Sequence, residues 1–191
     1  MRSAVDDGPW RLRRAEPGET GLVAALLDEA SAWLGSRGVR QWPARFAPDL
    51  LAPAVAAGET WLALSGGAVI GTVTVDHDDP AWSDLPGPAV YAHRLAVRRH
   101  GRGLGAALLH RAGLEAAGSG CDRLRLDCLA SNPGLCRYYE DLGFRPRGTV
   151  VVGGAPGQRE SGADAVRTVV RRFERGLRHW TPRAGPPPAA P

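Results

Sequence analysis

The chain has 191 residues, enough for one domain with a sizeable core. Hydrophobic residues make up 43% of it and charged residues 23%, a balance that is typical of globular domains and excludes a disordered chain. The net charge of +4 would suit a nucleic-acid partner. Every basic residue is an arginine, however, which indicates a compositional bias, and we expect no nucleic-acid partner.

The cysteines and the first residues bear on where the protein works. Three cysteines form no Cys-x-x-Cys pair, so we expect reduced, partly buried thiols and no disulfide framework. Residues 1–9 contain two aspartates and a proline where a signal peptide needs an apolar run. No apolar stretch reaches the length of about 18 residues that a membrane helix needs. The sequence therefore predicts a cytoplasmic protein that does not span a membrane.

Hydrophobic periodicity and turn residues divide the chain into strands and helices. Leu22, Leu26 and Ala30, for example, recur at helical spacing before Gly35, which ends the expected helix. The expected helices span 18–34, 48–57, 103–117 and 132–142. The expected strands span 10–15, 60–64, 68–75, 89–97, 123–129, 144–152 and 165–173. In 123–129, leucine and cysteine alternate with arginine and aspartate, which predicts a half-buried strand.

This order predicts an α/β (α+β) fold with a mixed, mostly antiparallel sheet of six to seven strands and four flanking helices. Antiparallel hairpins come first, and a parallel strand–helix–strand step follows. We expect one domain over residues 10–175. Residues 1–9 form an N-terminal extension, and the Pro- and Gly-rich residues 176–191 are expected to be a disordered tail.

The most informative segment is a glycine-rich turn between the expected strand 89–97 and the expected helix 103–117. Gly101, Gly103 and Gly105 let a backbone approach a ligand closely, and a helix N-terminus offers free N–H groups and a positive dipole. No acidic residue lies between Asp84 and Glu115, whereas five arginines do. The segment therefore predicts a site for a phosphate-bearing ligand.

Two other interpretations of the turn exist. It satisfies the dinucleotide fingerprint, as Gly101-x-Gly103-x-x-Ala106 with Asp127 in the place of a ribose-binding acid. It is also compatible with a strand-to-helix turn that binds nothing. A doubly wound fold starts at its fingerprint, however, and here three or four strands come first and fewer than 90 residues follow. The position in the chain therefore argues against the dinucleotide site.

Two motifs resemble signatures of the GNAT superfamily of N-acetyltransferases. Residues 97–105 resemble its acyl-CoA signature, and Asn132 with Tyr139-Glu-Asp-Leu-Gly143-Phe144 is similar to its second one. The motifs stand in the family's order, about 30 residues apart, and the resemblance covers residues 10–175. The chain departs from the pattern at His100, where the family usually has Gln or Arg. This position serves mainly through its backbone N–H, so we expect acetyl-CoA to bind.

The resemblance implies a sheet that splays between its fourth and fifth strands, with the pantetheine arm of the cofactor in the gap. The diphosphate would lie on backbone N–H groups of residues 100–106, and arginine side chains would reach the phosphates. The implied cofactor-binding residues are Leu95, Ala96, Val97, Arg98, Arg99, His100, Gly101, Arg102, Gly103, Leu104, Gly105, Ala106 and Asn132.

The implied reaction moves an acetyl group from the thioester to an amine in a ternary complex. Tyr139 matches the family's general acid, although a tyrosine there is also compatible with simple core packing. The base is open: His93 lies on the strand near the thioester, Asp76 and Asp127 are rivals, and a water chain would also serve. We expect no metal, since His77-Asp78-Asp79 is typical of a solvated loop.

The acceptor site is expected among the N-terminal helices and the loop before residue 89. Its candidate residues are Trp33, Gln41, Trp42, Asp76 and Trp82. Aromatic walls bind amines by cation–π contact, and the aspartates of residues 76–84 would attract a cation, so we expect a small-molecule amine. The alternatives are a non-catalytic CoA-binding regulatory module and an acetyltransferase for a tRNA-borne or protein amine. A monomer or a homodimer fits the sequence.

Overall fold

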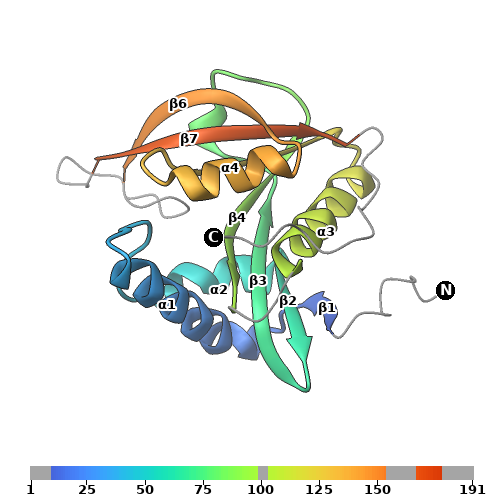
Figure 1. The fold of residues 1–191 in the computed structure, drawn as a ribbon. Helices are drawn as coiled ribbons and strands as arrows, with labels where there is room; N and C mark the ends of the chain where they lie inside the picture. The colour runs from blue at the N-terminus through green and yellow to red at the C-terminus, as the bar shows by residue number, and fades with distance from the viewer. Residues whose placement is uncertain (1–9, 99–102, 154–166, 178–191) are drawn as a thin grey trace.

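A mixed sheet with the strand order β1-β2-β3-β4-β5-β7-β6 organises the described part of the chain (Figure 1). The computed structural model describes residues 10–98, 103–153 and 167–177. The strands are β1 (Arg11–Arg14), β2 (Thr60–Ser65), β3 (Ala68–Asp76), β4 (Ala89–Val97), β5 (Arg123–Leu129), β6 (Arg145–Gly153) and β7 (Arg167–Gly176). The helices are α1 (Thr20–Ser36), α2 (Pro48–Ala56), α3 (Leu104–Gly118) and α4 (Pro133–Asp141), with 3-10 turns η1 (Pro17–Glu19) and η2 (Pro80–Trp82).

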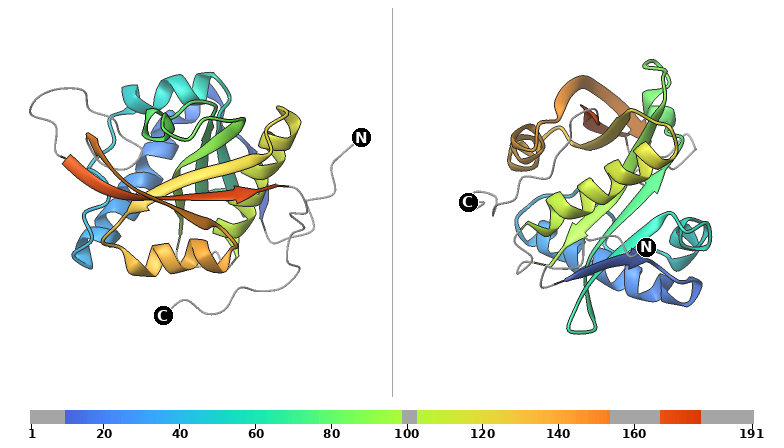
Figure 2. Two further views of the ribbon diagram at one scale, coloured as in Figure 1. Left: turned by 90° about the horizontal axis from the view of Figure 1, so that it is seen from above. Right: turned by 90° about the vertical axis from the view of Figure 1, so that its right-hand side faces the viewer.

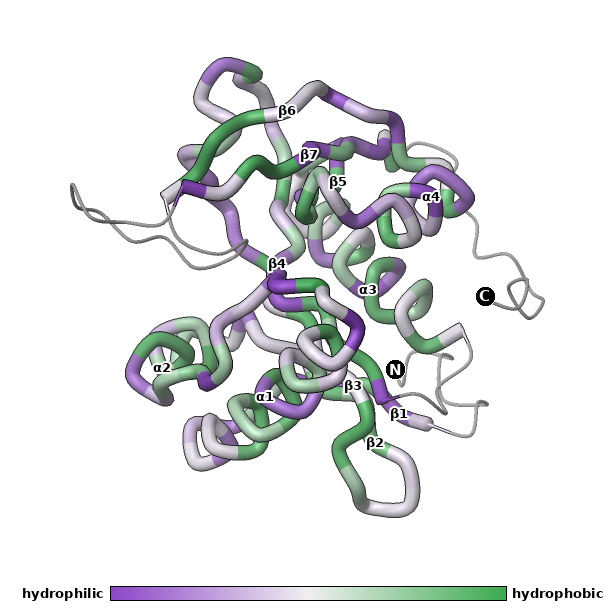
Figure 3. Tube along the Cα trace, turned by 60° about the vertical axis from the view of Figure 1, so that its left-hand side comes forward, coloured by the Kyte–Doolittle hydropathy of each residue, from purple (hydrophilic) through white to green (hydrophobic). Residues whose placement is uncertain are grey.

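The alternating side chains of β2 show how the layers form. Trp61 and Ala63 join a core cluster with α3, whereas Leu62 and Leu64 join a second cluster with α1 and α2. Helices α1 and α2 thus cover one face of the β1–β4 half of the sheet, and α3 covers the other (Figure 2). The hydropathy-coloured trace shows the mostly hydrophobic β2 between these layers (Figure 3). Helix α4 packs with β5 and β7 through residues such as Tyr139.

Strands β4 and β5 pair only at one end. Their parallel ladder comprises Ala89↔Arg123, Val90↔Leu124 and Tyr91↔Arg125, although both strands continue beyond it. All other neighbouring strands in the described sheet pair in the antiparallel sense. The predicted mixed sheet with one parallel step and a splay after the fourth strand is therefore confirmed.

A β-bulge interrupts β4 just beyond this short ladder. On the β3 side, Thr72 faces Ala96 and Thr74 faces His93, so two residues of β4 lie opposite one residue of β3. One of the two, Arg94, has φ of 52°, and no other non-glycine residue of the described segments has a positive φ. A residue other than glycine is strained in this left-handed backbone conformation, and such strain is concentrated at functional sites. The bulge therefore marks the open end of β4.

The polar face of β5 is not exposed as the alternation of residues 123–129 predicted. Arg125 is 1% exposed, because its guanidinium pairs with Glu174 at 2.8 Å and its NH1 donates to Tyr91 Oη at 3.2 Å. Trp82 stacks against the same guanidinium at 4.9 Å. The residues around η2 therefore form a third layer over β4, β5 and β7 that periodicity did not reveal.

The cysteines are free thiols, as the sequence predicted. Of the three, Cys121, Cys128 and Cys136, the last two are buried with their sulfurs 3.7 Å apart. Burial raises the pKa of the Cys128 thiol far above its ordinary value, which keeps it protonated and unreactive. Among the helices of the described segments, none combines the length and the apolar character needed to cross a bilayer.

Candidate active site

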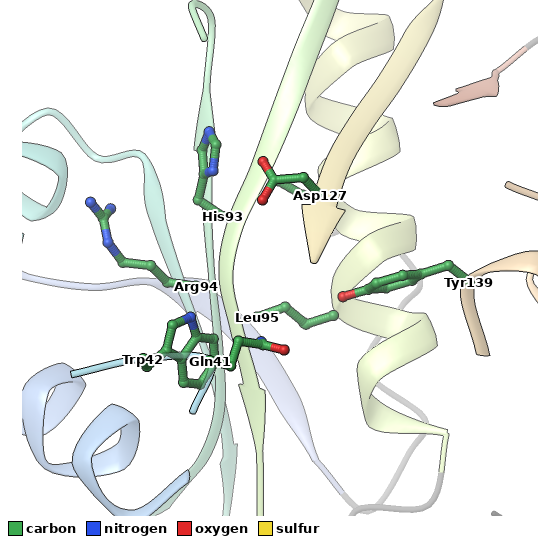
Figure 4. A pocket seen from close by; sticks show the side chains of 8 residues that line it. Gln41, Trp42, His93, Arg94, Leu95, Asp127 and Tyr139 are labelled. Atoms are coloured by element: carbon green, nitrogen blue, oxygen red, sulfur yellow. The ribbon is translucent and has the colours of Figure 1, made fainter. Parts of the chain in front are cut away.

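A small pocket, open to solvent, lies where β4 and β5 separate (Figure 4). It is lined by Gln41, Trp42, Ala92, His93, Arg94, Leu95, Asp127 and Tyr139. The bulge of β4, the diverging part of β5, helix α4 and the segment after α1 thus all contribute side chains. Figure 4 shows Asp127 and Tyr139 on one side of β4, with Arg94 and Trp42 on the other.

The register of the sheet explains why His93 and Asp127 meet. Tyr91↔Arg125 is the last pair of the parallel ladder, so His93 and Asp127 occupy the next positions with the same side-chain direction. The two side chains therefore face each other across the gap that the splay opens. Together with Asp79 they offer polar atoms that all lie within 4.8 Å of one another, a spacing that would also suit a metal ion.

A cluster of carboxylates surrounds the imidazole of His93. Its Nε2 lies 3.6 Å from Asp76 Oδ2 and 3.5 Å from Asp79 Oδ2. Asp79 is fixed in turn, because its Oδ1 accepts a hydrogen bond from the backbone N–H of Ala81 at 2.8 Å, in the first turn of η2. The loop after β3 therefore positions acidic groups behind His93.

Burial gives the two facing groups unusual proton affinities. It raises the pKa of Asp127 to about 6, with the Arg172 guanidinium acting in the opposite direction. It lowers the pKa of His93 to about 4, although Asp76 opposes that change. At neutral pH the imidazole is therefore neutral, and the Asp127 carboxylate is mostly ionised and has the higher proton affinity. A base with a pKa near the working pH is the most effective, which favours Asp127 over His93.

Tyr139 reaches the pocket from α4. Its ring is buried against Phe144 and Phe173, with centroid distances of 6.0 and 5.6 Å. Burial raises the pKa of its hydroxyl well above the ordinary value, so the group stays protonated at neutral pH. Tyr139 is therefore a core residue that also lines the pocket, with a protonated hydroxyl at neutral pH.

The remaining acyl-CoA candidates lie along the end of β4 and the start of α3. Leu95 lines the pocket, Ala96 is buried in the cluster of α1 and α2, and Val97 is 38% exposed. Arg98 pairs with Glu29 at 3.0 Å. The predicted phosphate contacts of Arg99, His100, Gly101 and Arg102 lie outside the described residues.

Helix α3 begins immediately after that segment. Gly103 is its N-cap and has φ of 78°, a conformation that glycine adopts without strain. Leu104 and Gly105 are buried, and Ala106 is half-buried. Asn132 is the N-cap of α4, where its Oδ1 accepts a hydrogen bond from Leu135 N at 3.1 Å.

The predicted acceptor residues separate into two groups. Gln41 and Trp42 line the pocket, and Asp76 lies behind His93. Trp33, in contrast, is 40% exposed on α1, and Trp82 is 2% exposed within the layer around η2; neither lines the pocket. The loop aspartates are also partly engaged within the protein, because Asp84 pairs with Arg172. Arg94 was singled out only as one of several basic residues, and no sequence signal placed it in the pocket.

Gly105 makes a close contact that a variant can test. A Cβ atom there would lie 2.6 Å from Tyr138 Oη. We expect Gly105→Ala to be overpacked and to lower the melting temperature by several degrees. Adding Tyr138→Phe, which removes that oxygen, should restore most of the loss. Thermal unfolding of the two single variants and the double variant measures this, and an unrescued double variant would disprove the contact as the cause.

The short parallel ladder between β4 and β5, with α3 between these strands in the chain, is the arrangement that the resemblance predicted. The family model of the acetyltransferase (GNAT) family matches residues 27–144, so the chain belongs to this family. It is 28% identical over 133 residues to the uncharacterised N-acetyltransferase YesJ of Bacillus subtilis, covering 64% of this chain and 74% of YesJ. The protein is thus a GNAT N-acetyltransferase.

Solved structures show the same fold. A GNAT acetyltransferase of Listeria monocytogenes matches with a TM-score of 0.66 and 21% identity, over 87% of this chain and 94% of that one. The putative acetyltransferase yncA of Salmonella typhimurium, solved with its cofactor acetyl-CoA, matches with a TM-score of 0.61 and 18% identity. That match covers 92% of this chain and 99% of the other.

Proposed function

We propose that the protein transfers the acetyl group of acetyl-CoA to a primary amine of a small molecule by direct attack in a ternary complex. The observation that carries the proposal is the convergence of Asp127, His93 and Tyr139 on one pocket, at the point where β4 and β5 part. These side chains supply a proton acceptor, a neutral imidazole and a proton donor around one small volume.

The acyl donor would lie along the open edge of β4. Beyond Tyr91, the backbone of β4 has no strand partner on the β5 side in the described sheet. An extended pantetheine arm can bond to Leu95, Ala96 and Val97 there as a further strand would. The diphosphate would then meet the N–H groups at the start of α3, where the helix dipole favours anions. Asn132 would approach the same arm from the start of α4.

The chemistry requires the acceptor nitrogen to lose two protons and the thiolate to gain one. The ammonium form of the acceptor transfers a proton to the Asp127 carboxylate, and the neutral amine attacks the thioester carbonyl. A C–N bond forms, the oxyanion is stabilised by a backbone N–H of β4, the nitrogen of the intermediate releases its second proton to solvent, and collapse of the intermediate breaks the C–S bond. The leaving thiolate takes the hydroxyl proton of Tyr139, which is restored from Asp127 or solvent. His93, neutral at pH 7, orients the amine by accepting a hydrogen bond.

The proposal is tested by thiol release from acetyl-CoA with a panel of amines, alongside calorimetric titration of acetyl-CoA. We expect titratable acetyl-CoA binding and amine-dependent thiol release. Binding without turnover over the whole panel would instead favour the regulatory module. Absence of acetyl-CoA binding would refute the proposed function.

Tyr139→Phe should lower kcat about tenfold and leave acetyl-CoA affinity unchanged. A thiol has an ordinary pKa of about 8.5, so its thiolate leaves with only moderate help from an acid, which limits the loss. The ring and its contacts with Phe144 and Phe173 are kept in the variant. Single-turnover kinetics with saturating acetyl-CoA measure the effect, with Tyr138→Phe as the matched control. An unchanged chemical step would assign the acid role to water.

A further inference from the structure

Two polar groups that line the pocket lack partners among the residues that the structure describes. Gln41 is only 6% exposed, and its Oε1 has no hydrogen-bond partner among the described residues. The Nε of Arg94 is likewise buried and without a partner in the same part of the chain. Buried polar groups in native proteins are nearly always satisfied, by protein, water or ligand, so these two atoms are available to bond to a molecule that enters the pocket.

The segment that carries Gln41 is fixed in place. Ser31 Oγ donates to Pro43 O at 2.6 Å, and Asp28 Oδ1 accepts from Phe46 N at 2.7 Å, so the chain after α1 is bonded to that helix at two points. Trp42 packs edge-on against Phe46 at 5.8 Å. Gln41 is therefore held in its buried position by its neighbours, and its amide oxygen points toward the side of Leu95 and Tyr139 (Figure 4).

Arg94 is held in the pocket by the bulge of β4. Its positive φ departs from the alternation of the strand and directs the side chain to the opposite side of the pocket from Tyr139 (Figure 4). Burial lowers the pKa of Arg94, while Asp76 and Glu59 raise it, and an arginine stays charged under such influences. A planar guanidinium can bind a carboxylate group through two parallel hydrogen bonds.

The pocket is therefore polarised. The Asp127 carboxylate lies on one side of the pocket, and the Arg94 guanidinium, with Asp76 and Glu59 near it, lies on the other. An acceptor with only an ammonium group would be repelled by Arg94, whereas an acceptor that carries both charges would match both sides.

We propose that the acceptor is an amino acid, whose carboxylate binds the Arg94 guanidinium and whose amine donates a hydrogen bond to Gln41 Oε1 while it faces Asp127. This inference rests on the proposed function, because it names the class of amine that the same site acetylates. Gln41 and Arg94 are then specificity residues, and the proton acceptor and donor remain Asp127 and Tyr139.

The test compares matched acceptors in the thiol-release assay: L-amino acids, their carboxamides and the corresponding decarboxylated amines. All three carry the same amine and side chain, and only the first carries the anion. We expect kcat/KM for the best amino acid to exceed that of its carboxamide by at least about tenfold, as for a site built to bond a group that the analogue lacks. Comparable or better turnover of the carboxamide or the decarboxylated amine overturns the inference.

Variants of the two pocket residues show which side chain distinguishes the amino acid from its carboxamide. Arg94→Lys keeps the charge but loses the planar fork, so the preference for the amino acid over its carboxamide, as a ratio of kcat/KM, should fall about tenfold. Gln41→Leu should raise KM for both acceptors, and Gln41→Glu, which keeps an acceptor oxygen, should retain more activity. Arg11→Gln removes an exposed arginine of β1 and serves as the charge control. Thermal unfolding of each variant verifies that it is folded.

The outcomes separate the two proposals. If acetyl-CoA binds and other amines are acetylated but amino acids are not, the carboxylate site is refuted and the acetyltransferase assignment stands. If acetyl-CoA does not bind, the proposed function itself fails. An Arg94→Lys variant that loses activity equally toward amino acid and carboxamide would show that Arg94 acts only on the structure, and this also refutes the inference.

Discussion

Asp127→Asn is expected to lower kcat/KM by at least about 100-fold and, at the same pH, to raise the stability of the protein. The first effect follows from the loss of the proton acceptor, since general bases contribute about 100- to 10,000-fold. The parent kcat/KM should rise with pH through about 6, where the Asp127 carboxyl loses its proton. The asparagine variant should lack this rise, and a pH–rate profile measures both.

The stability effect has a definite sign. Burial raises the pKa of Asp127 to about 6, so between pH 4 and 6 the folded protein holds a proton that the unfolded chain releases. The free energy of unfolding therefore falls as the pH rises through this range, by up to about 3 kcal/mol at about 1.4 kcal/mol per pKa unit. The neutral asparagine avoids this cost.

The control for this prediction is the same comparison at acidic pH. The variant should melt several degrees above the parent at pH 7.5 and about equally at pH 4. His93 has the opposite effect on stability: its pKa is lowered to about 4, so the free energy of unfolding rises with pH. Both proteins contain His93, so its effect is the same in the parent and in the variant. Equal melting temperatures at pH 7.5 would show that the carboxylate is well solvated and is not the elevated base.

Gly103→Glu should weaken acetyl-CoA binding at least about 100-fold. The new carboxylate would stand at the N-cap of α3, where the diphosphate is expected, and like charges brought together cost several kcal/mol. Gly103 also has φ of 78°, so any side chain adds strain. Isothermal titration with acetyl-CoA measures the loss.

A matched variant separates charge at the site from backbone strain. Gly120 follows the C-terminal end of α3 with φ of 77°, and a Cβ there would meet no atom within 4 Å. Gly120→Glu should therefore carry a similar strain and leave acetyl-CoA affinity unchanged. Equal weakening by both variants would contradict a diphosphate site at the start of α3.

The elements that follow strong local signals could be predicted from the sequence. The strands β4 and β5 have the expected bounds, since their hydrophobic runs end at glycine, proline or polar turns. Helix α1 begins at Thr20, two residues later than expected, because Pro17 to Glu19 form the separate 3-10 turn η1. The predicted family is confirmed, and so is the predicted succession of helices and strands along the chain.

The interior of the candidate site could be predicted only in part. Tyr139, Asp127 and His93 were found as candidates, but their approach depends on where the parallel ladder stops, which is a property of the sheet and not of any local pattern. The bulge at Arg94 lies in an ordinary-looking run, Ala-His-Arg-Leu, that contains no glycine to announce it. The burial of Arg125 also depends on partners that are distant in sequence, Tyr91 and Glu174.

The three-pair ladder between β4 and β5 has one further consequence. Where the ladder stops, main-chain amides of β4 point into the gap, and only water or a guest can satisfy them. An acyl carrier that contains amide groups can form the hydrogen bonds with β4 that water otherwise forms, whereas a hydrocarbon chain cannot. We therefore expect the gap to recognise the peptide-like character of the pantetheine arm before any side chain distinguishes one thioester from another.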